Sequence, residues 1–394
     1  MTTGIALAGP VLQRGTGAIP GDHYLPADPR ELLWGRLPCA ADAPALSVGS
    51  GETVTIDTLS HEGLLADQGR DPLAFFGAHG VAADQVLTEA VDLARSDRPH
   101  DLTVDGPHLV NRPIEVRGAR VGDLLAITVL RLDRRVPYGV ISNRHGRGAL
   151  AGELPESPGT VSVFSSVRET PEGAVGELPL HAGGPRTVRF PLRPFLGVMG
   201  VAAAGGRRPH SVPPGPHGGN LDISLLVEGA TLYLPVQVPG AGAYIGDPHF
   251  AQGDGEVCLT ALEASLRATV RFDVVPASEA AERFGTASGP IAETREYLIP
   301  TGLDADLDLA TANCVRAALG LLQARYGMDR HLAYAYLSAA TDFRISQVVD
   351  LVKGVHAPIR KADFGEPLLD PPGSAAALRP PAEADRRHLG GDSR

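Results

Sequence analysis

Residues 114–132, IEVRGARVGDLLAITVLRL, show how the chain is built, because a short alternating segment leads through a Gly-containing turn into a strongly apolar run. This order predicts two β-strands joined as a hairpin. Residues 46–58, LSVGSGETVTIDT, repeat the alternation after a Gly-Ser-Gly turn and predict a half-buried strand. Farther along, the β-branched runs TLYLPVQV and ATVRFDVV predict strands that are covered on both faces. The sequence therefore predicts a β-rich protein.

Two regions depart from this strand pattern. Residues 72–96 carry apolar side chains at helical spacing, which predicts one or two surface helices. Residues 307–326 and 329–340 repeat apolar residues at i, i+3 and i+4 with few Gly or Pro, which predicts two further helices. The expected fold class is β-rich α+β, with a multi-stranded β-sandwich-like core, peripheral helices and a helical segment near the C-terminus.

We expect this organisation to follow four parts of the chain. Residues 1–185 form an N-terminal β-rich domain with a helical insertion, and residues 186–300 form a second β-rich block. Residues 301–370 form a C-terminal helical and closing segment. Residues 371–394 are rich in Pro, Ala and charge, so that they cannot bury enough surface to order themselves, and we expect a flexible tail.

Composition narrows the classes of function. The chain has 394 residues with 47 Gly, 34 Pro and 5% aromatic residues, which favours short strands and turns over long helices. A net charge of -11 without a basic block argues against nucleic-acid binding. Cys39, Cys258 and Cys314 lie far apart, so neither a disulfide framework nor a thiolate zinc site is indicated. With no secretory signal and no apolar run of about 20 residues, we expect a cytoplasmic protein without a membrane partner.

The chemistry-bearing residues concentrate in two polar islands between apolar strands, HGGNLD at residues 217–222 and GDPHFAQGDGE at residues 246–256. Together the islands contain His217, Asn220, Asp222, Asp247, His249, Gln252, Asp254 and Glu256. Imidazole and carboxylate ligands with a spare carboxylate are what a metal-dependent hydrolase needs, because a bound cation lowers the pKa of water towards about 7. The alternative is structural, since Asp and Asn beside Gly are also common turn formers.

Several stretches of the chain resemble one known protein family. The stretches VPPGPHGGNLDISLLVEGATLYLPV and GAYIGDPHFAQGDGEVCLTALE resemble signature blocks of the acetamidase/formamidase family. Upstream, IDTLSHEGL, GPHLVNRPIEVRGARVGDLLAI and VPYGVISNRHGRGAL resemble further blocks, and YLSAATDFRISQVVDLVKGVHAPI resembles the closing segment. The resemblance covers about residues 20–365. It implies hydrolysis of a short linear amide to a carboxylate and ammonia, a divalent metal that is commonly zinc, and a homo-oligomer.

The resemblance also suggests roles for individual residues. The expected metal ligands are Asp57, His61, His217, Asp222, Asp247 and His249. Glu256 is the expected general base, with Gln252 and His145 as further catalytic candidates, and the expected substrate-binding residues are Asn220, His108 and Arg144. Structural roles stay open for several of them, because Asp57 and His61 can also end a strand and cap a turn, and Arg144 can pair with a buried Asp.

Two alternatives to the hydrolysis of a linear amide remain. Some relatives of the family hydrolyse γ-lactams, so a γ-lactam or cyclic-imide hydrolase is possible, and a non-catalytic metal-containing small-molecule-binding protein is another possibility.

The chain has Asn111-Arg112-Pro113 where the family usually has Thr-Gly-Pro, and a cation bordering the pocket would favour an anionic substrate. Cys258 lies in an apolar segment with no Lys nearby, which argues against a nitrilase-type nucleophile. No motif indicates a nucleotide.

Overall fold

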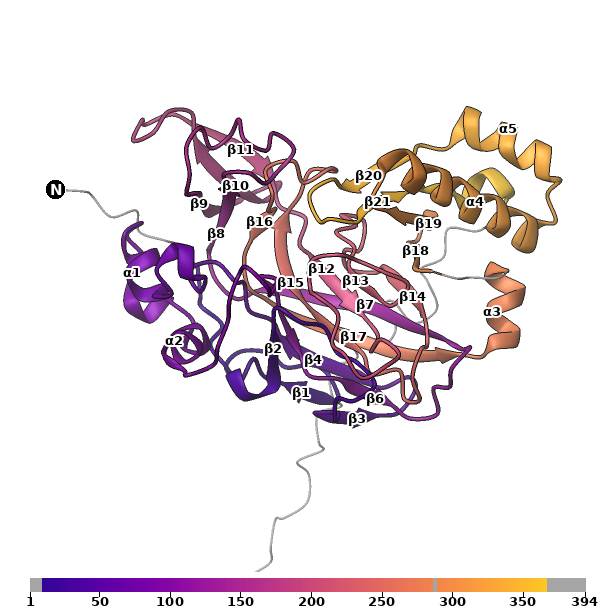
Figure 1. The fold of residues 1–394 in the computed structure, drawn as a ribbon, viewed down its shortest axis with the longest axis horizontal. Coiled ribbons are helices and arrows are strands. Elements are labelled where there is room, and N and C mark those ends of the chain that lie inside the picture. The colour runs from indigo at the N-terminus through magenta and orange to yellow at the C-terminus, as the bar shows by residue number, and fades with distance from the viewer. Residues whose placement is uncertain (1–8, 286–288, 367–394) are drawn as a thin grey trace, which may run out of the picture.

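The computed structural model describes residues 9–285 and 289–366, and shows two large β-sheets with helices at the periphery (Figure 1). The first sheet contains ten strands, in the order β1-β4-β17-β7-β14-β18-β19-β21-β20, with β22 paired to β19. Its strands are β1 (His23–Leu25), β4 (Thr53–Asp57), β17 (Leu266–Val275), β7 (Leu124–Arg134), β14 (Thr231–Pro235), β18 (Ile291–Glu293), β19 (Tyr297–Asp304), β21 (Lys353–His356), β20 (Arg344–Gln347) and β22 (Ile359–Arg360).

The second sheet also has ten strands and carries the polar islands of the sequence. Its main path runs β11-β10-β9-β8-β16-β15-β12-β13, with β5 paired to both β15 and β2. Its strands are β11 (Thr187–Pro191), β10 (Gly173–Pro179), β9 (Thr160–Thr170), β8 (Tyr138–Arg144), β16 (Leu262–Glu263), β15 (Tyr244–Ala251), β12 (Phe195–Gly200), β13 (Gly218–Asn220), β5 (Leu109–Asn111) and β2 (Leu32–Trp34). A separate parallel pair joins β3 (Leu46–Val48) to β6 (Ile114–Val116).

The helices lie at the edges of this strand core (Figure 1). The α-helices are α1 (Pro72–Gly77), α2 (Thr88–Arg95), α3 (Ala277–Phe284), α4 (Leu307–Tyr326) and α5 (Arg330–Ala340), and the 3₁₀ turns are η1 (Pro29–Glu31), η2 (Ala66–Gln68), η3 (Ala83–Gln85) and η4 (Lys361–Phe364). Among the described residues no helix has both the length and the apolar character needed to cross a membrane.

The predicted fold class is confirmed, and the C-terminal helices agree with the prediction in both position and length. The Asp306 side chain accepts a hydrogen bond from Leu309 N at the start of α4, and Gly327 ends the helix in the left-handed conformation. Helix α4 packs closely on β19 at Gly302. A Cβ added to this residue would lie 2.2 Å from the Ala310 carbonyl oxygen, so no larger residue fits there. The terminal stretch predicted to be a flexible tail, residues 371–394, lies outside the described residues.

The hairpin predicted for residues 114–132 is wrong, although both of its strands form. Strand β6 pairs in parallel with β3, whereas β7 lies between β17 and β14. The turn between them therefore connects two different sheets. Side chains from both large sheets fill one core, which includes Leu125 and Val270 of the first sheet and Leu196 and Ile245 of the second.

Candidate functional site

A cavity of about 780 Å³ lies where the second sheet meets the loop between β20 and β21. The size is typical of a small-molecule site. Buried polar residues on its inner wall come from distant parts of the chain: His61, His108, Asn220, Asp247, Glu256, Glu263 and Asp350. Strand β15 supplies the centre of this wall, because Asp247 and His249 are two residues apart on the strand and Glu263 of β16 lies directly opposite His249.

Three histidines surround the carboxylate of Asp247. His249 Nε2 lies 3.1 Å from Asp247 Oδ2, and His108 Nε2 lies 3.7 Å from the same oxygen. His61 Nδ1 lies 3.8 Å from the other oxygen, Oδ1. Burial alone would raise the pKa of Asp247, but the histidines, His108 first, outweigh burial and lower the pKa well below its usual range. Asp247 is therefore the charged centre of the site.

Gln252 fixes the orientation of the His249 ring. Its amide nitrogen donates to the backbone oxygens of Asp222 and Ser346, at 2.9 and 3.1 Å, so that its Oε1 faces His249 Nδ1 at 3.1 Å. In this arrangement Nδ1 faces Gln252, and Nε2 lies at hydrogen-bond distance from two carboxylates, 3.1 Å from Asp247 Oδ2 and 3.1 Å from Glu263 Oε1. Gln252, predicted to be catalytic, is thus a residue that positions His249.

The other two histidines are supported in the same way on the side away from Asp247. His61 Nε2 lies 3.3 Å from Glu62 Oε1, and the Ser142 hydroxyl donates to Glu62 Oε2 at 2.6 Å. His108 Nδ1 lies 3.0 Å from the Ser211 hydroxyl. Each imidazole therefore presents one nitrogen to Asp247 and the other to a polar neighbour, which is how histidines are commonly oriented around a metal ion.

The site also concentrates buried negative charge. Its five carboxylates are Asp222, Asp247, Glu256, Glu263 and Asp350, and each is at most 8% exposed. Within the described part of the chain, none of the five forms an ion pair with Lys or Arg. Burial followed by the neighbouring carboxylates raises the pKa of Asp222 and Glu256 well above the usual range, and raises that of Asp350 to about 8.

The backbone is strained at three of these acids. The φ angles of Asp222, Asp247 and Glu256 are 51°, 50° and 48°. They lie in the left-handed region, which residues other than Gly seldom adopt. Such strain concentrates at functional sites, where the surrounding structure holds it. Opposite them, a Cβ on Gly197 would lie 2.5 Å from Asp222 Oδ1 and 2.6 Å from Asp247 Oδ2. The carboxylate oxygens thus converge on a space that only Gly leaves open.

The residues present fit a divalent cation. Asp222, Asp247 and His249 offer three ligand atoms that lie within 4.8 Å of one another, and three other combinations of the buried residues meet the same criterion. Both carboxylate oxygens of Asp222, together with Asp247 Oδ1 and Glu263 Oε2, are buried and have no hydrogen-bond partner among the described residues. Buried polar atoms of this kind normally have partners, so their shared lack of one indicates a ligand.

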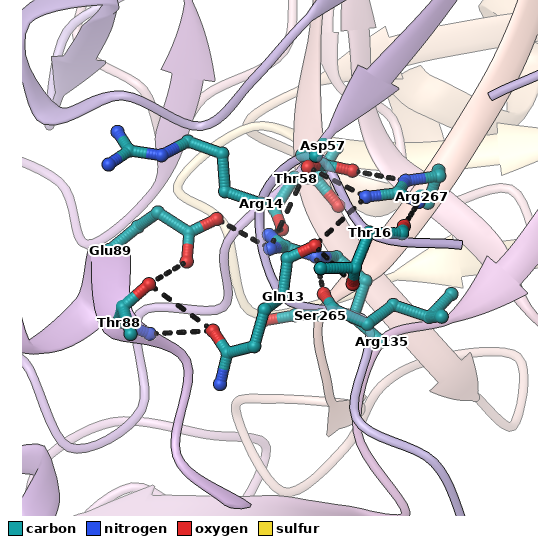
Figure 2. Close-up of polar contacts among 12 residues, drawn as sticks. Gln13, Arg14, Thr16, Asp57, Thr58, Thr88, Glu89, Arg135, Ser265 and Arg267 are labelled. Carbon is teal, nitrogen blue, oxygen red and sulfur yellow. Dashed lines mark hydrogen bonds and ion pairs between the residues drawn. The ribbon is translucent and has the colours of Figure 1, made fainter. Parts of the chain in front are cut away.

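The structure corrects the prediction that Asp57 binds a metal. Asp57 lies opposite Arg267 on the neighbouring strands β4 and β17, and the Arg267 guanidinium donates to both of its oxygens, at 2.6 and 3.1 Å (Figure 2). The Tyr24 hydroxyl donates to it as well, at 2.6 Å. Arg135 lies 3.7 Å from Asp57 and also pairs with Glu89. Asp57 is therefore part of a buried ion-pair network.

His217 and Arg112 also lie apart from the cluster. His217 Nδ1 is 3.3 Å from the Tyr244 hydroxyl, and His217 belongs to none of the metal-capable groups found among the described residues, so the structure does not bring this predicted ligand to the cluster. Arg112 pairs with Glu31 at 2.9 Å and does not line the cavity, so the departure from the family pattern does not alter the pocket wall.

The remaining predicted residues line the cavity at different depths. Asn220 and His108 are buried beside the cluster. Arg144 lines the outer part of the cavity and pairs at 2.6 Å with Asp67, which is exposed, whereas the structural alternative expected a buried Asp. His145 is exposed, and its Nδ1 lies 2.8 Å from the Pro155 carbonyl oxygen.

Sequence reasoning missed Glu62, Glu263 and Asp350. Each is a single acid, and Glu263 and Asp350 stand in the apolar contexts CLTALEASL and QVVDLV. The signal that could have identified them is a single carboxylate inside an apolar run of the sequence, because an unpaired charge is seldom buried without a function.

Comparisons with known proteins agree with this geometry. A model of the Acetamidase/Formamidase family matches residues 201–359, which include both polar islands. A formamidase from Methylophilus methylotrophus is 30% identical over 265 residues, 55% of this chain and 64% of that protein. An acetamidase from Mycolicibacterium smegmatis is 28% identical over 236 residues, 47% of this chain and 57% of that protein. The chain thus spans somewhat less than two thirds of the length of these relatives.

Solved structures extend the likeness to most of the chain. The crystal structure of an acetamidase from Bacillus halodurans has a TM-score of 0.66 and 26% identity, and the match covers 87% of this chain and 98% of that one. An acetamidase from Yersinia enterocolitica has a TM-score of 0.67 at 22% identity, over 92% and 96% of the two chains, which shows a shared fold. The resemblance inferred from the sequence is confirmed.

Proposed function

We propose that this chain, which shares the fold and the motif region of the acetamidase/formamidase family, hydrolyses a small linear amide to a carboxylate and ammonia. The observation that carries the proposal is the cluster of buried carboxylates and histidines around Asp247 at the inner wall of the cavity. Amide hydrolysis needs an activated water, a polarised carbonyl and a group that carries a proton to the leaving nitrogen.

Asp222, Asp247 and His249 are the proposed ligands of a divalent cation, for which we expect zinc. A mixed set of imidazole and carboxylate ligands suits zinc. When bound, such an ion lowers the pKa of a coordinated water and polarises the substrate carbonyl. The orientation of His249 by Gln252 serves the same end, since it holds Nε2 on the side of the Asp247 and Glu263 carboxylates.

Glu256 is the proposed proton carrier. Its side chain is buried and lines the cavity, and among the described residues it has no ion pair with Lys or Arg. Burial and the Asp350 carboxylate raise its pKa, which makes it a better acceptor of a proton from water than an exposed glutamate. The protonated Glu256 then donates to the leaving nitrogen. Asn220 and His108, which lie on the same wall, are the proposed contacts of the substrate.

The test is an ammonia-release assay on the purified full chain, loaded with zinc and offered formamide, acetamide, longer amides and lactams. We expect ammonia from a linear amide, and a Glu256→Gln variant that loses about 10²- to 10⁴-fold in rate while keeping its metal. Glu282→Gln, on the exposed face of α3, is the matched control and should retain full activity. Ring opening of a lactam without ammonia release from any linear amide would overturn the proposal. A cytoplasmic location and a homo-oligomeric state remain predictions.

A further inference from the structure

We propose that the substrate is an amide whose acyl chain ends in a carboxylate, and that Arg147 binds this carboxylate at the outer part of the cavity. The inference deepens the proposed function and rests on it for the hydrolysis itself. Because the proposed reaction releases ammonia, the amide nitrogen carries no further group, and the anionic group has to stand at the other end of the acyl chain. The substrate class is therefore the monoamides of short dicarboxylic acids.

The size of the cavity leaves room for such a chain. Its volume is about 780 Å³, whereas formamide has the volume of a few water molecules, each about 30 Å³. The cluster around Asp247 forms the inner wall, and Leu102, Arg147 and Leu351 line the same cavity from other segments. Arg147 is exposed, so it lies on the solvent side. An acyl chain that starts at the inner wall therefore has space to extend towards Arg147.

Arg147 is a charge of the outer part that has no acidic partner among the described residues. The other charged side chains there are compensated, because Arg144 pairs with Asp67 at 2.6 Å and Asp105 pairs with Arg36 at 2.8 Å. Arg147 thus leaves one positive charge in excess. A guanidinium binds a carboxylate through two parallel N–H donors, which suits Arg147 to hold the anionic end of a substrate.

The backbone around Arg147 is held beside the segment that carries Glu256. Ala149 N donates to the Val257 carbonyl oxygen at 2.9 Å. A Cβ added to Gly148, whose φ is 85°, would lie 3.3 Å from the same oxygen, so the two segments approach closely there. The loop between β8 and β9 is thus packed against the residue that follows Glu256. Arg147 therefore starts from a fixed place relative to the proposed proton carrier.

His210 provides a second donor close to Arg147. The backbone N–H of Val212 donates to His210 Nδ1 at 3.1 Å, so the neutral ring carries its proton on Nε2. Burial, followed by the charges of Arg36 and Arg147, lowers the pKa of His210 and keeps the ring neutral at neutral pH. His210 lines the cavity. It can therefore donate a hydrogen bond to a carboxylate that Arg147 binds.

The charges of the cavity orient such a substrate. The buried carboxylates around Asp247 repel an anion at the inner wall, whereas Arg147 attracts it at the outer part. The neutral amide end is therefore favoured at the inner wall, beside the groups that act on it. In the reaction the oxygen of water bonds to the acyl carbon, the C–N bond breaks and the leaving nitrogen takes up a proton. The products are ammonia and a dicarboxylate.

The test compares glutaramate with pentanamide, which has the same chain length and no charge. Ammonia release by the zinc-loaded full chain gives kcat/KM for each amide. We expect glutaramate to be preferred, and Arg147→Gln to lower the ratio of the two kcat/KM values about 10-fold. Arg186→Gln, exposed between β10 and β11 and outside the cavity lining, is the matched control and should keep the wild-type ratio. A wild-type preference for pentanamide, or an unchanged ratio in Arg147→Gln, would overturn the inference.

Ionic strength provides a second measurement that needs no variant. Because Arg147 is exposed, added salt screens its charge. We expect the KM of glutaramate to rise between about 0.01 M and about 1 M sodium chloride, and that of pentanamide to change less. A KM of glutaramate that does not depend on salt contradicts recognition by charge. If circular dichroism shows that Arg147→Gln does not fold, this series on the wild type decides alone.

Binding of the products separates this inference from the proposed function. Glutarate and pentanoate share a carboxylate at one end, and only glutarate has a second one for Arg147. Calorimetric titration should show tighter binding of glutarate to the wild type, and Arg147→Gln should reduce the difference about 10-fold. Such a difference without turnover of any amide would leave the anion site standing and remove the function. Turnover of both amides with equal binding of the two acids would have the opposite meaning.

Discussion

The interior of this protein contains two clusters of buried charge that differ in one respect. Around Asp57, two carboxylates meet two guanidiniums, because Arg267 pairs with Asp57, and Arg135 with both Asp57 and Glu89; all four side chains are fully buried (Figure 2). Around Asp247, five buried carboxylates meet only histidines in the described part of the chain. The first cluster is balanced by two Arg side chains, whereas the second has no Lys or Arg partner among the described residues.

The difference separates structure from function. In the balanced cluster the guanidiniums also donate to backbone oxygens of the N-terminal segment, namely those of Leu12, Gln13 and Thr16, so the network holds that segment against the sheet. In the Asp247 cluster the described residues provide no Lys or Arg to pair with the carboxylates, which is the arrangement expected of a site that binds a cation. Balance of charge, more than burial or the number of acids, therefore distinguishes a structural cluster from a candidate site.

Breaking the balanced cluster should have the largest effect. Asp57→Asn leaves the buried Arg267 guanidinium without its carboxylate, and we expect it to lower the free energy of unfolding by about 3–5 kcal/mol, measured by urea denaturation. Asp133→Asn is the matched control, because Asp133 pairs with Arg131 near the surface of β7. The control should cost at most about 1 kcal/mol. Equal costs for the two variants would show that balance inside the core is unimportant.

Removing the proposed cation from the Asp247 cluster should lower the stability of the protein. We expect the zinc-loaded protein, at a free zinc concentration of about 100 times the dissociation constant, to be more stable than the chelated protein by about 2.7 kcal/mol. Thermal unfolding with and without a chelator measures this difference. If the midpoint of unfolding does not change although zinc binds, the cluster is not completed by the ion.

Loosening the support of His249 should have a moderate effect. Gln252→Met removes the acceptor of Nδ1–H, and we expect zinc affinity to fall about 10- to 100-fold, in a titration against a competing chelator. Gln323→Met, on the exposed face of α4, is the control and should bind zinc as the wild type does. Unchanged affinity in the Gln252 variant would mean that other contacts orient the histidine.

The smallest effect should have the opposite sign to the first. Asp222→Asn removes a buried acid that has no Lys or Arg partner among the described residues and whose pKa is raised by burial, so we expect the metal-free protein to gain about 0.5–2 kcal/mol of stability while amide hydrolysis is lost. Urea denaturation in the presence of a chelator measures the gain, and the ammonia assay measures the loss. A less stable metal-free variant would show that Asp222 has a structural role and would weaken the comparison.

The sequence predicts well what local chemistry determines. The C-terminal helices follow from apolar spacing and from end signals such as Asp306 and Gly327. The hairpin at residues 114–132 fails because its strands take partners far away in the chain, which no local pattern shows. Strand pairing in this protein is mostly non-local, so topology was beyond the sequence.

The same distinction applies to the site. Asp222, Asp247, His249 and Glu256 stand in polar islands that contain glycines, and the sequence predicts them as site residues that the structure brings together. Glu263 and Asp350 were missed because each is alone in an apolar run. Asp57 was expected to be a ligand from the family resemblance of its sequence block, whereas its cross-strand neighbour is Arg267. The partner of a side chain is set by strand register, which the sequence alone does not show.

The acids of the cavity are drawn from widely separated segments, and the last of them, Asp350, lies in the loop before β21. A nascent chain that has not yet emerged past this loop lacks one wall of the cavity, whatever part of the sheets has already formed. Capture of the proposed ion should therefore come late in biosynthesis, after the C-terminal segment has docked. In a pulse-labelled cell, zinc should increase the resistance of full-length chains to proteases and should not increase that of truncated chains.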